Sequence, residues 1–106
     1  MSVRFSALAT TLLTMITAVQ AAPSPPGDPA AGREFIMRSC VSCHAPDEAT
    51  RAVDGAPSLS FIARDNKERP AFIRGWLMAP HSPMPEILLS RQQINDIIAY
   101  LETLAP

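Results

Sequence analysis

The chain has 106 residues, which is enough for one domain and not for two. It carries 9 basic and 10 acidic residues, a formal net charge of −1 at pH 7. This near balance argues against nucleic acid or an anionic membrane surface as a partner. The 11 prolines leave room for only a modest core. Domains this small commonly need a disulfide, a metal or a cofactor for stability.

The N-terminal segment is typical of a secretory signal peptide. One positive charge, Arg4, precedes an uncharged apolar run over 7–19, and small residues follow. This run is shorter than the ~20 residues that a membrane-spanning helix needs. We therefore expect residues 1–21 to be removed by cleavage after Ala21, with no stable membrane insertion afterwards. The domain at 22–106 then keeps eight basic and ten acidic residues, a formal charge of −2.

Three main helices and one short helix are predicted in this domain, and no run of residues alternates as a strand would. Asp28 is a good N-cap, and Pro29 suits the first helical position. Ser90 and Gln93 match a capping box ahead of an apolar stripe with helical spacing. Prolines and an Asp-Gly pair predict long loops, which in so small a domain need something to wrap around. The expected helices are 29–39, a short one at 59–64, 70–79 and 91–104.

A C-x-x-C-H motif is the strongest chemical signal in the sequence. Cys40 and Cys43 have the spacing at which two thiols add to the two vinyl groups on one side of a haem. His44 follows directly, where its imidazole can serve as an axial ligand to the iron. The motif therefore predicts one covalently attached c-type haem, held by the two cysteines and ligated by His44.

Three alternatives for these residues remain open. Cys40 and Cys43 could form a structural disulfide, which an exported location permits. They could be a thioredoxin-like redox pair, although no βαβ pattern accompanies them. They could bind zinc together with His44 or His81, but zinc sites normally have two well separated ligand pairs, and here only His81 lies apart. The export signal together with the complete motif favours haem over all three.

A second axial ligand is expected opposite His44, because haem used for electron transfer is normally six-coordinate. Met37 is too close to the cysteines on the same helix, and Met78 on the next main helix is more simply explained by core packing. Met84 stands in a loop between two prolines, which stiffen the backbone and lower the entropy cost of presenting its sulfur. Met84 is therefore the predicted second ligand to iron, and His81 is the alternative.

With these motifs the sequence resembles class I cytochrome c, a family of small electron carriers, over nearly all of residues 22–106. The resemblance implies an all-α fold of three main helices, a short helix and long loops wrapped around one covalent haem. The segments that carry the resemblance are D-P-x-x-G-x-x-F at 28–35, the haem motif at 40–44, G-A-P-S-L at 55–59, P-M-P at 83–85 and the last helix with Tyr100.

The resemblance also implies roles for residues outside the haem motif. The Pro57 carbonyl is expected to accept a hydrogen bond from the His44 ring and so to orient this ligand. Gly32 is expected at a close crossing of the first and last helices, where Tyr100 packs. Trp76 either donates its indole N–H to a haem propionate or packs in the core, and the sequence leaves both open.

These features predict an electron carrier and not an enzyme, because no acid, base or nucleophile constellation is apparent. Iron is expected to cycle between Fe(III) and Fe(II), exchanging electrons with redox partner proteins in the periplasm. The rivals are a haem protein with an open site for a gas or peroxide, a non-haem exported module, and a subunit of a larger oxidoreductase. Lys67 is the single lysine, so docking through a basic ring is not expected. The apolar wall of the haem site is expected to comprise Phe35, Leu59, Ile62, Phe72, Ile73, Leu77, Ile87, Leu88, Ile98 and Leu101.

Overall fold

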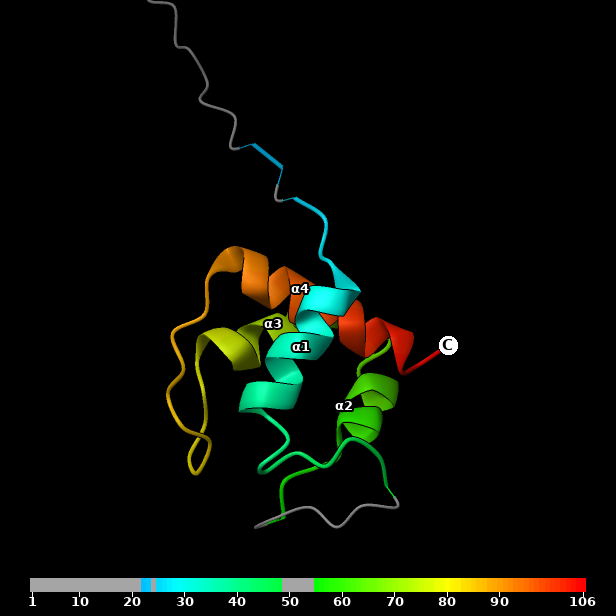
Figure 1. Cartoon of the computed structure of the whole chain (residues 1–106), viewed down its shortest axis with the longest axis vertical. Helices are drawn as coiled ribbons and strands as arrows, with labels where there is room; N and C mark the ends of the chain where they lie inside the picture. The colour runs from blue at the N-terminus through cyan, green and yellow to red at the C-terminus, as the bar shows by residue number, and fades with distance from the viewer. Residues whose placement is uncertain (1–21, 24, 49–54) are drawn as a thin grey trace, which may run out of the picture.

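The computed structural model describes residues 22–23, 25–48 and 55–106, and over these ranges it is helical without strands (Figure 1). The expected all-α fold is thereby confirmed. The predicted signal peptide lies outside the described residues. Within them, no helix is long and apolar enough to cross a membrane. The helices are α1 (Pro29–Ser39), α2 (Leu59–Asp65), α3 (Pro70–Met78) and α4 (Arg91–Thr103).

The two longest helices begin at the caps that the sequence predicts. The Asp28 side chain accepts hydrogen bonds from the first backbone amides of α1, at 2.8 Å from Ala30 N. Ser90 and Gln93 form the complete capping box at the start of α4, because each side chain accepts a hydrogen bond from the other residue's backbone N–H. Such caps satisfy amide donors that have no partner inside the helix. Local sequence therefore determines where α1 and α4 start.

Helices α1 and α4 cross in direct backbone contact at the centre of the molecule (Figure 1). A Cβ atom built on Gly32 would lie 1.9 Å from the carbonyl oxygen of Asp96, so only glycine fits at this point of the crossing. A Cβ atom on Gly27 would likewise meet the backbone of α4, at 2.1 Å. Phe35 and Tyr100 are partly buried and pack against the core. The predicted close approach at Gly32 is therefore present.

The apolar stripe of α4 forms the centre of the core. The side chains of Ile94, Ile97, Ile98 and Leu101 are 3–6% exposed, as their helical spacing predicts. Ile36 of α1 is the most deeply buried large side chain, at 1% exposure. The whole buried cluster, drawn from all four helices and the C-terminal end, comprises Ile36, Leu59, Ala63, Ile73, Ile94, Ile97, Ile98, Leu101 and Ala105.

A polar network ties the segment before α1 to α3 and α4. Asp96 is buried and accepts a hydrogen bond from the Asp28 backbone N–H at 2.8 Å. Asn95, also buried, donates from Nδ2 to the Pro25 carbonyl at 2.9 Å and accepts at Oδ1 from Arg74 at 2.7 Å. Buried polar groups are stable only when they are paired in this way. The network thus fixes the N-terminal segment and α3 on the frame of α4.

Candidate functional site

The C-x-x-C-H motif lies in a tight turn at the end of α1. Cys40 is the C-cap of this helix, and its backbone N–H donates to the Ile36 carbonyl at 2.8 Å. The Cys40 carbonyl then accepts from the backbone N–H groups of Cys43 and His44, at 3.2 and 2.9 Å. This winding holds the two cysteines and the histidine in one compact turn. Cys40 is half-buried whereas Cys43 is exposed, and burial raises the pKa of the Cys40 thiol.

The described residues give no support to the disulfide and zinc alternatives. Cys40 and Cys43 are free thiols. Within the ranges that the structure covers, no three side chains of His, Cys, Asp or Glu come together as metal ligands. The thioredoxin-like alternative lacks its βαβ context as well, since all the described elements are helices.

The His44 ring is oriented by a carbonyl from the other side of the loop. Its Nδ1 lies 2.8 Å from the carbonyl oxygen of Pro57. A carbonyl oxygen can only accept, so Nδ1 carries a proton and donates, and in the neutral ring the lone pair is then on Nε2. A second bond, from the Leu59 backbone N–H to the Ala45 carbonyl at 2.8 Å, joins the same two segments. The fold thus holds the His44 ring in one orientation, as the ring of a metal-binding histidine is normally held.

A mostly apolar cavity of about 250 Å³ connects this turn with the loop that follows α3. It is bounded by side chains from all four helices and the connecting loops. Five of the six predicted site residues line it, namely Cys40, His44, Pro57, Trp76 and Met84. The sixth, Cys43, is exposed and is not among the lining residues.

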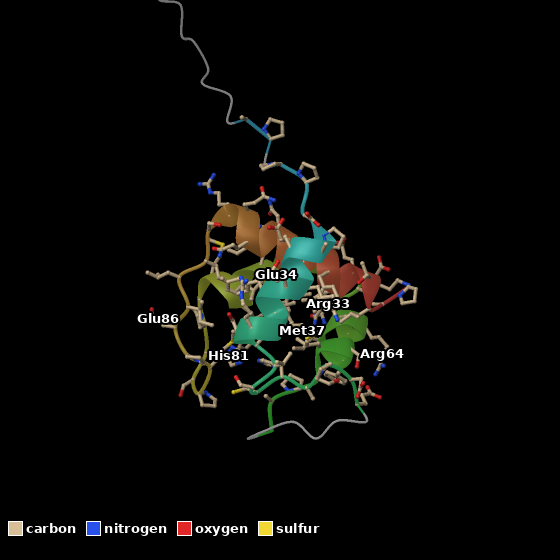
Figure 2. The ribbon with its side chains drawn as sticks, in the orientation of Figure 1. Arg33, Glu34, Met37, Arg64, His81 and Glu86 are labelled. Atoms are coloured by element: carbon tan, nitrogen blue, oxygen red, sulfur yellow. The ribbon has the colours of Figure 1, made fainter. Side chains whose placement is uncertain are left out.

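Of the three methionines in the described part of the chain, only Met84 lines the cavity. Met78 is 68% exposed on α3, so the core packing expected for it is wrong. Met37 lies on α1 (Figure 2). It is not among the residues that line the cavity. The loop between α3 and α4 contains a turn, which is closed by a hydrogen bond from the Met84 backbone N–H to the His81 carbonyl at 2.6 Å. This turn brings both candidate second ligands to the same cavity.

Trp76 and His81 meet at the edge of the cavity. Their ring centroids are 3.9 Å apart and the ring planes are nearly perpendicular, at 89°. Figure 2 shows His81 on the inner side of the loop, while Glu86 extends outward from its other limb. Trp76 is 42% exposed, so the alternative of plain core packing does not describe its position.

The apolar wall of the cavity was predicted correctly at six positions, namely Leu59, Ile62, Phe72, Ile73, Leu77 and Leu101. The prediction of Leu88 is wrong, because this residue lies in the irregular segment before α4 and is 97% exposed. Phe35, Ile87 and Ile98 are also absent from the lining. Ile36, Phe61, Asn66 and Ile97 line the cavity without having been predicted.

Asn66 could not have been found from sequence patterns, since a polar residue after a short helix is normally solvated. Its side chain is buried, and Nδ2 donates to the Ile62 carbonyl at 2.9 Å. This bond determines the orientation of the amide group, because an oxygen cannot face a carbonyl. Among the described residues no group donates to Asn66 Oδ1. The cavity therefore contains a buried acceptor that a bound group or a trapped water would complete.

The residues present fit a covalently attached haem. Two thiols can attach the vinyl groups of a haem, and an imidazole and a thioether are side chains that can ligate its iron. Three aromatic side chains that line the cavity, Phe61, Phe72 and Trp76, are 49, 46 and 42% exposed. Exposed apolar surface of this kind on a small protein marks a binding site, and a planar apolar group lying in the cavity would cover it.

Comparisons with known proteins agree with this chemistry. Residues 29–105 match the sequence model of the cytochrome c family. Over 99 residues the chain is 33% identical to cytochrome c-552 from Bradyrhizobium diazoefficiens. The matched region covers 89% of this chain and 91% of that protein. The helical fold, the C-x-x-C-H turn and both matches lead to one conclusion: the chain belongs to the cytochrome c family, as a class I monohaem electron carrier with covalently bound haem c.

Proposed function

We propose that this chain is an exported electron carrier whose haem c is attached through Cys40 and Cys43 and ligated by His44 and Met84. The observation that carries the proposal is that His44, held by Pro57, and Met84 border one cavity with Cys40. When bound, haem c supplies one-electron chemistry, in which its iron alternates between the ferric and ferrous states.

The two proposed axial ligands, His44 and Met84, are held in place in different ways. The hydrogen bond from His44 Nδ1 to the Pro57 carbonyl fixes the orientation of the ring, so Nε2 is held in position to bind the iron. Met84 is half-buried between two prolines, which restrict the unfolded loop and lower the entropy cost of ordering the side chain. A thioether is a soft ligand that favours ferrous iron, so Met84 raises the reduction potential. Two fixed ligands support electron transfer without ligand loss.

Trp76 is proposed to donate its indole N–H to a haem propionate. It lines the cavity, is partly open to solvent and is braced by the His81 ring. A side chain with an apolar body and a polar N–H suits the boundary between a haem plane and its charged edge.

The location and partners follow from the export signal proposed for residues 1–21 and from the chemistry of the surface. We place the mature domain, residues 22–106, in the periplasm, where it exchanges electrons with redox partner proteins. The described ion pairs join Arg38 to Glu34, Arg64 to Glu48 and Arg69 to Asp65. Of the six arginines and one lysine in the described part of the domain, three arginines and the lysine lie outside these pairs, and we propose no concentrated basic face for docking.

The test is an absorption spectrum of the full chain, expressed with its signal and a haem-attachment system. We expect sharp low-spin haem bands and, in the ferric protein, the weak near-infrared band of a thioether ligand. Met84→Ala should abolish this band and lower the reduction potential. Met78→Ala is the matched control, because its side chain is exposed and outside the cavity, and it should change neither. A folded product without haem, or a near-infrared band that survives Met84→Ala, contradicts the proposal.

A further inference from the structure

We propose that His81 is a reserve axial ligand, which binds the haem iron through an imidazole nitrogen when Met84 leaves it. This inference rests on the proposed function, since it takes Met84 as the resident ligand. It assigns a role to a cavity residue that the His44 and Met84 pair does not use.

Position is the first argument. His81 and Met84 both line the cavity, and they are linked by the turn in which the Met84 backbone N–H donates to the His81 carbonyl at 2.6 Å. A residue three positions away in a tight turn is a tethered competitor for the same site. Tethering gives such a side chain a high effective concentration, because its linker spans only a short distance.

The freedom of the imidazole is the second argument. Among the described residues no hydrogen bond involves the His81 ring, whereas Nδ1 of His44 is bonded to Pro57. The ring contact described for His81 is its perpendicular packing on Trp76, at 3.9 Å between ring centroids. An aromatic contact of this kind is weak beside a metal–ligand bond, so it holds the ring at the cavity without preventing its release.

The attachment of the loop is the third argument. Across residues 80–89, the described hydrogen bonds amount to the single one between Met84 and His81, and none joins this segment to a helix. A segment with so few hydrogen bonds to the fold, although Leu89 at its end packs against the core, can shift at a lower free-energy cost than a helix can. The same loop can therefore present either of its two ligands.

The exchange itself is a simple substitution at the iron. The bond to Met84 Sδ breaks and a bond to an imidazole nitrogen of His81 forms, and any proton on that nitrogen passes to solvent. No electron or group is transferred. Because imidazole is a harder ligand than a thioether, the exchange favours the ferric state and lowers the reduction potential. It also closes the site to small molecules.

The experiment compares Met84→Ala with the double variant Met84→Ala/His81→Phe in the haem-loaded protein. Phenylalanine keeps a ring beside Trp76 but has no nitrogen. We expect Met84→Ala to stay low-spin without the near-infrared band, and the double variant to become high-spin. If His81 occupies the site nine-tenths of the time, ferrous Met84→Ala should bind CO about tenfold more weakly than the double variant. Met84→Ala/Ser82→Ala is the control, since it alters the same turn and keeps His81, and it should bind CO as Met84→Ala does.

The two proposals fail in different ways. Equal CO affinity and equal high-spin spectra for the single and double variants would overturn the role of His81, whatever the wild-type spectrum shows. A wild-type protein without the near-infrared band would instead overturn Met84 as the resident ligand. Met84→Leu, which keeps the volume of the side chain, provides the same comparison where Met84→Ala disturbs the loop, and circular dichroism of every variant verifies the fold.

Discussion

Replacing Gly32 with alanine should separate the two helices on which the whole domain is built. The added Cβ would lie 1.9 Å from the Asp96 carbonyl oxygen and 2.4 Å from its carbon. Ordinary contact begins at 3.4 Å, so the backbones must move apart by about 1.5 Å at the crossing. Both obstructing atoms belong to the backbone of α4, so no side-chain rotation can relieve the overlap.

The size of the effect follows from two opposing contributions. Overpacking a close interface costs about 1–3 kcal/mol, and the backbone position of the clash places this case near the upper end. Alanine regains about 1 kcal/mol of helix propensity relative to glycine. We therefore expect Gly32→Ala to lower the free energy of unfolding by about 2 kcal/mol.

Gly75 provides a matched control in α3. A Cβ built there has no atom within 4 Å, so Gly75→Ala retains the propensity gain and should stabilise the protein by about 0.5–1 kcal/mol. Guanidinium chloride unfolding of the haem-loaded variants, followed by far-UV circular dichroism, measures both changes. The two substitutions should change the free energy of unfolding in opposite directions, although both glycines lie inside helices. A Gly32→Ala variant as stable as Gly75→Ala would refute the backbone-contact explanation.

Two further predictions concern the polar contacts of α4. Asp96→Ala removes the acceptor of the Asp28 N–H and should cost about 2 kcal/mol of unfolding free energy. The control Glu34→Ala breaks an exposed ion pair on α1 and should cost less than about 1 kcal/mol in the same denaturation series. Equal losses for Asp96→Ala and Glu34→Ala would contradict the argument that burial makes the Asp96 contact stabilising. Ser90→Ala removes the capping box and should cost about 1 kcal/mol, measured as a lower unfolding midpoint. An unchanged midpoint would show that α4 is fixed by packing alone.

Features that depend only on neighbouring residues could be predicted from the sequence. The helix starts at Asp28 and Ser90 are local, because a cap bonds amides only two or three positions away. The core stripe of α4 is also local, since helical geometry alone places residues three and four apart on one face. The spacing of Cys40, Cys43 and His44 is likewise chemistry within a single turn, which is why the cofactor class could be predicted from the motif.

Which side chains border the cavity depends on how the whole chain folds. Leu88 and Asn66 show this most clearly, since the apolar residue is exposed and the polar residue is buried. Their environments depend on where the loop after α3 runs and on how α2 meets α4, and no local pattern encodes either. The approach of Pro57 to His44 was implied by family resemblance, but its 2.8 Å contact needs two loop segments to fold together. Contacts between segments distant in the chain are set by the packing of the whole domain, and this is why sequence periodicity cannot supply them.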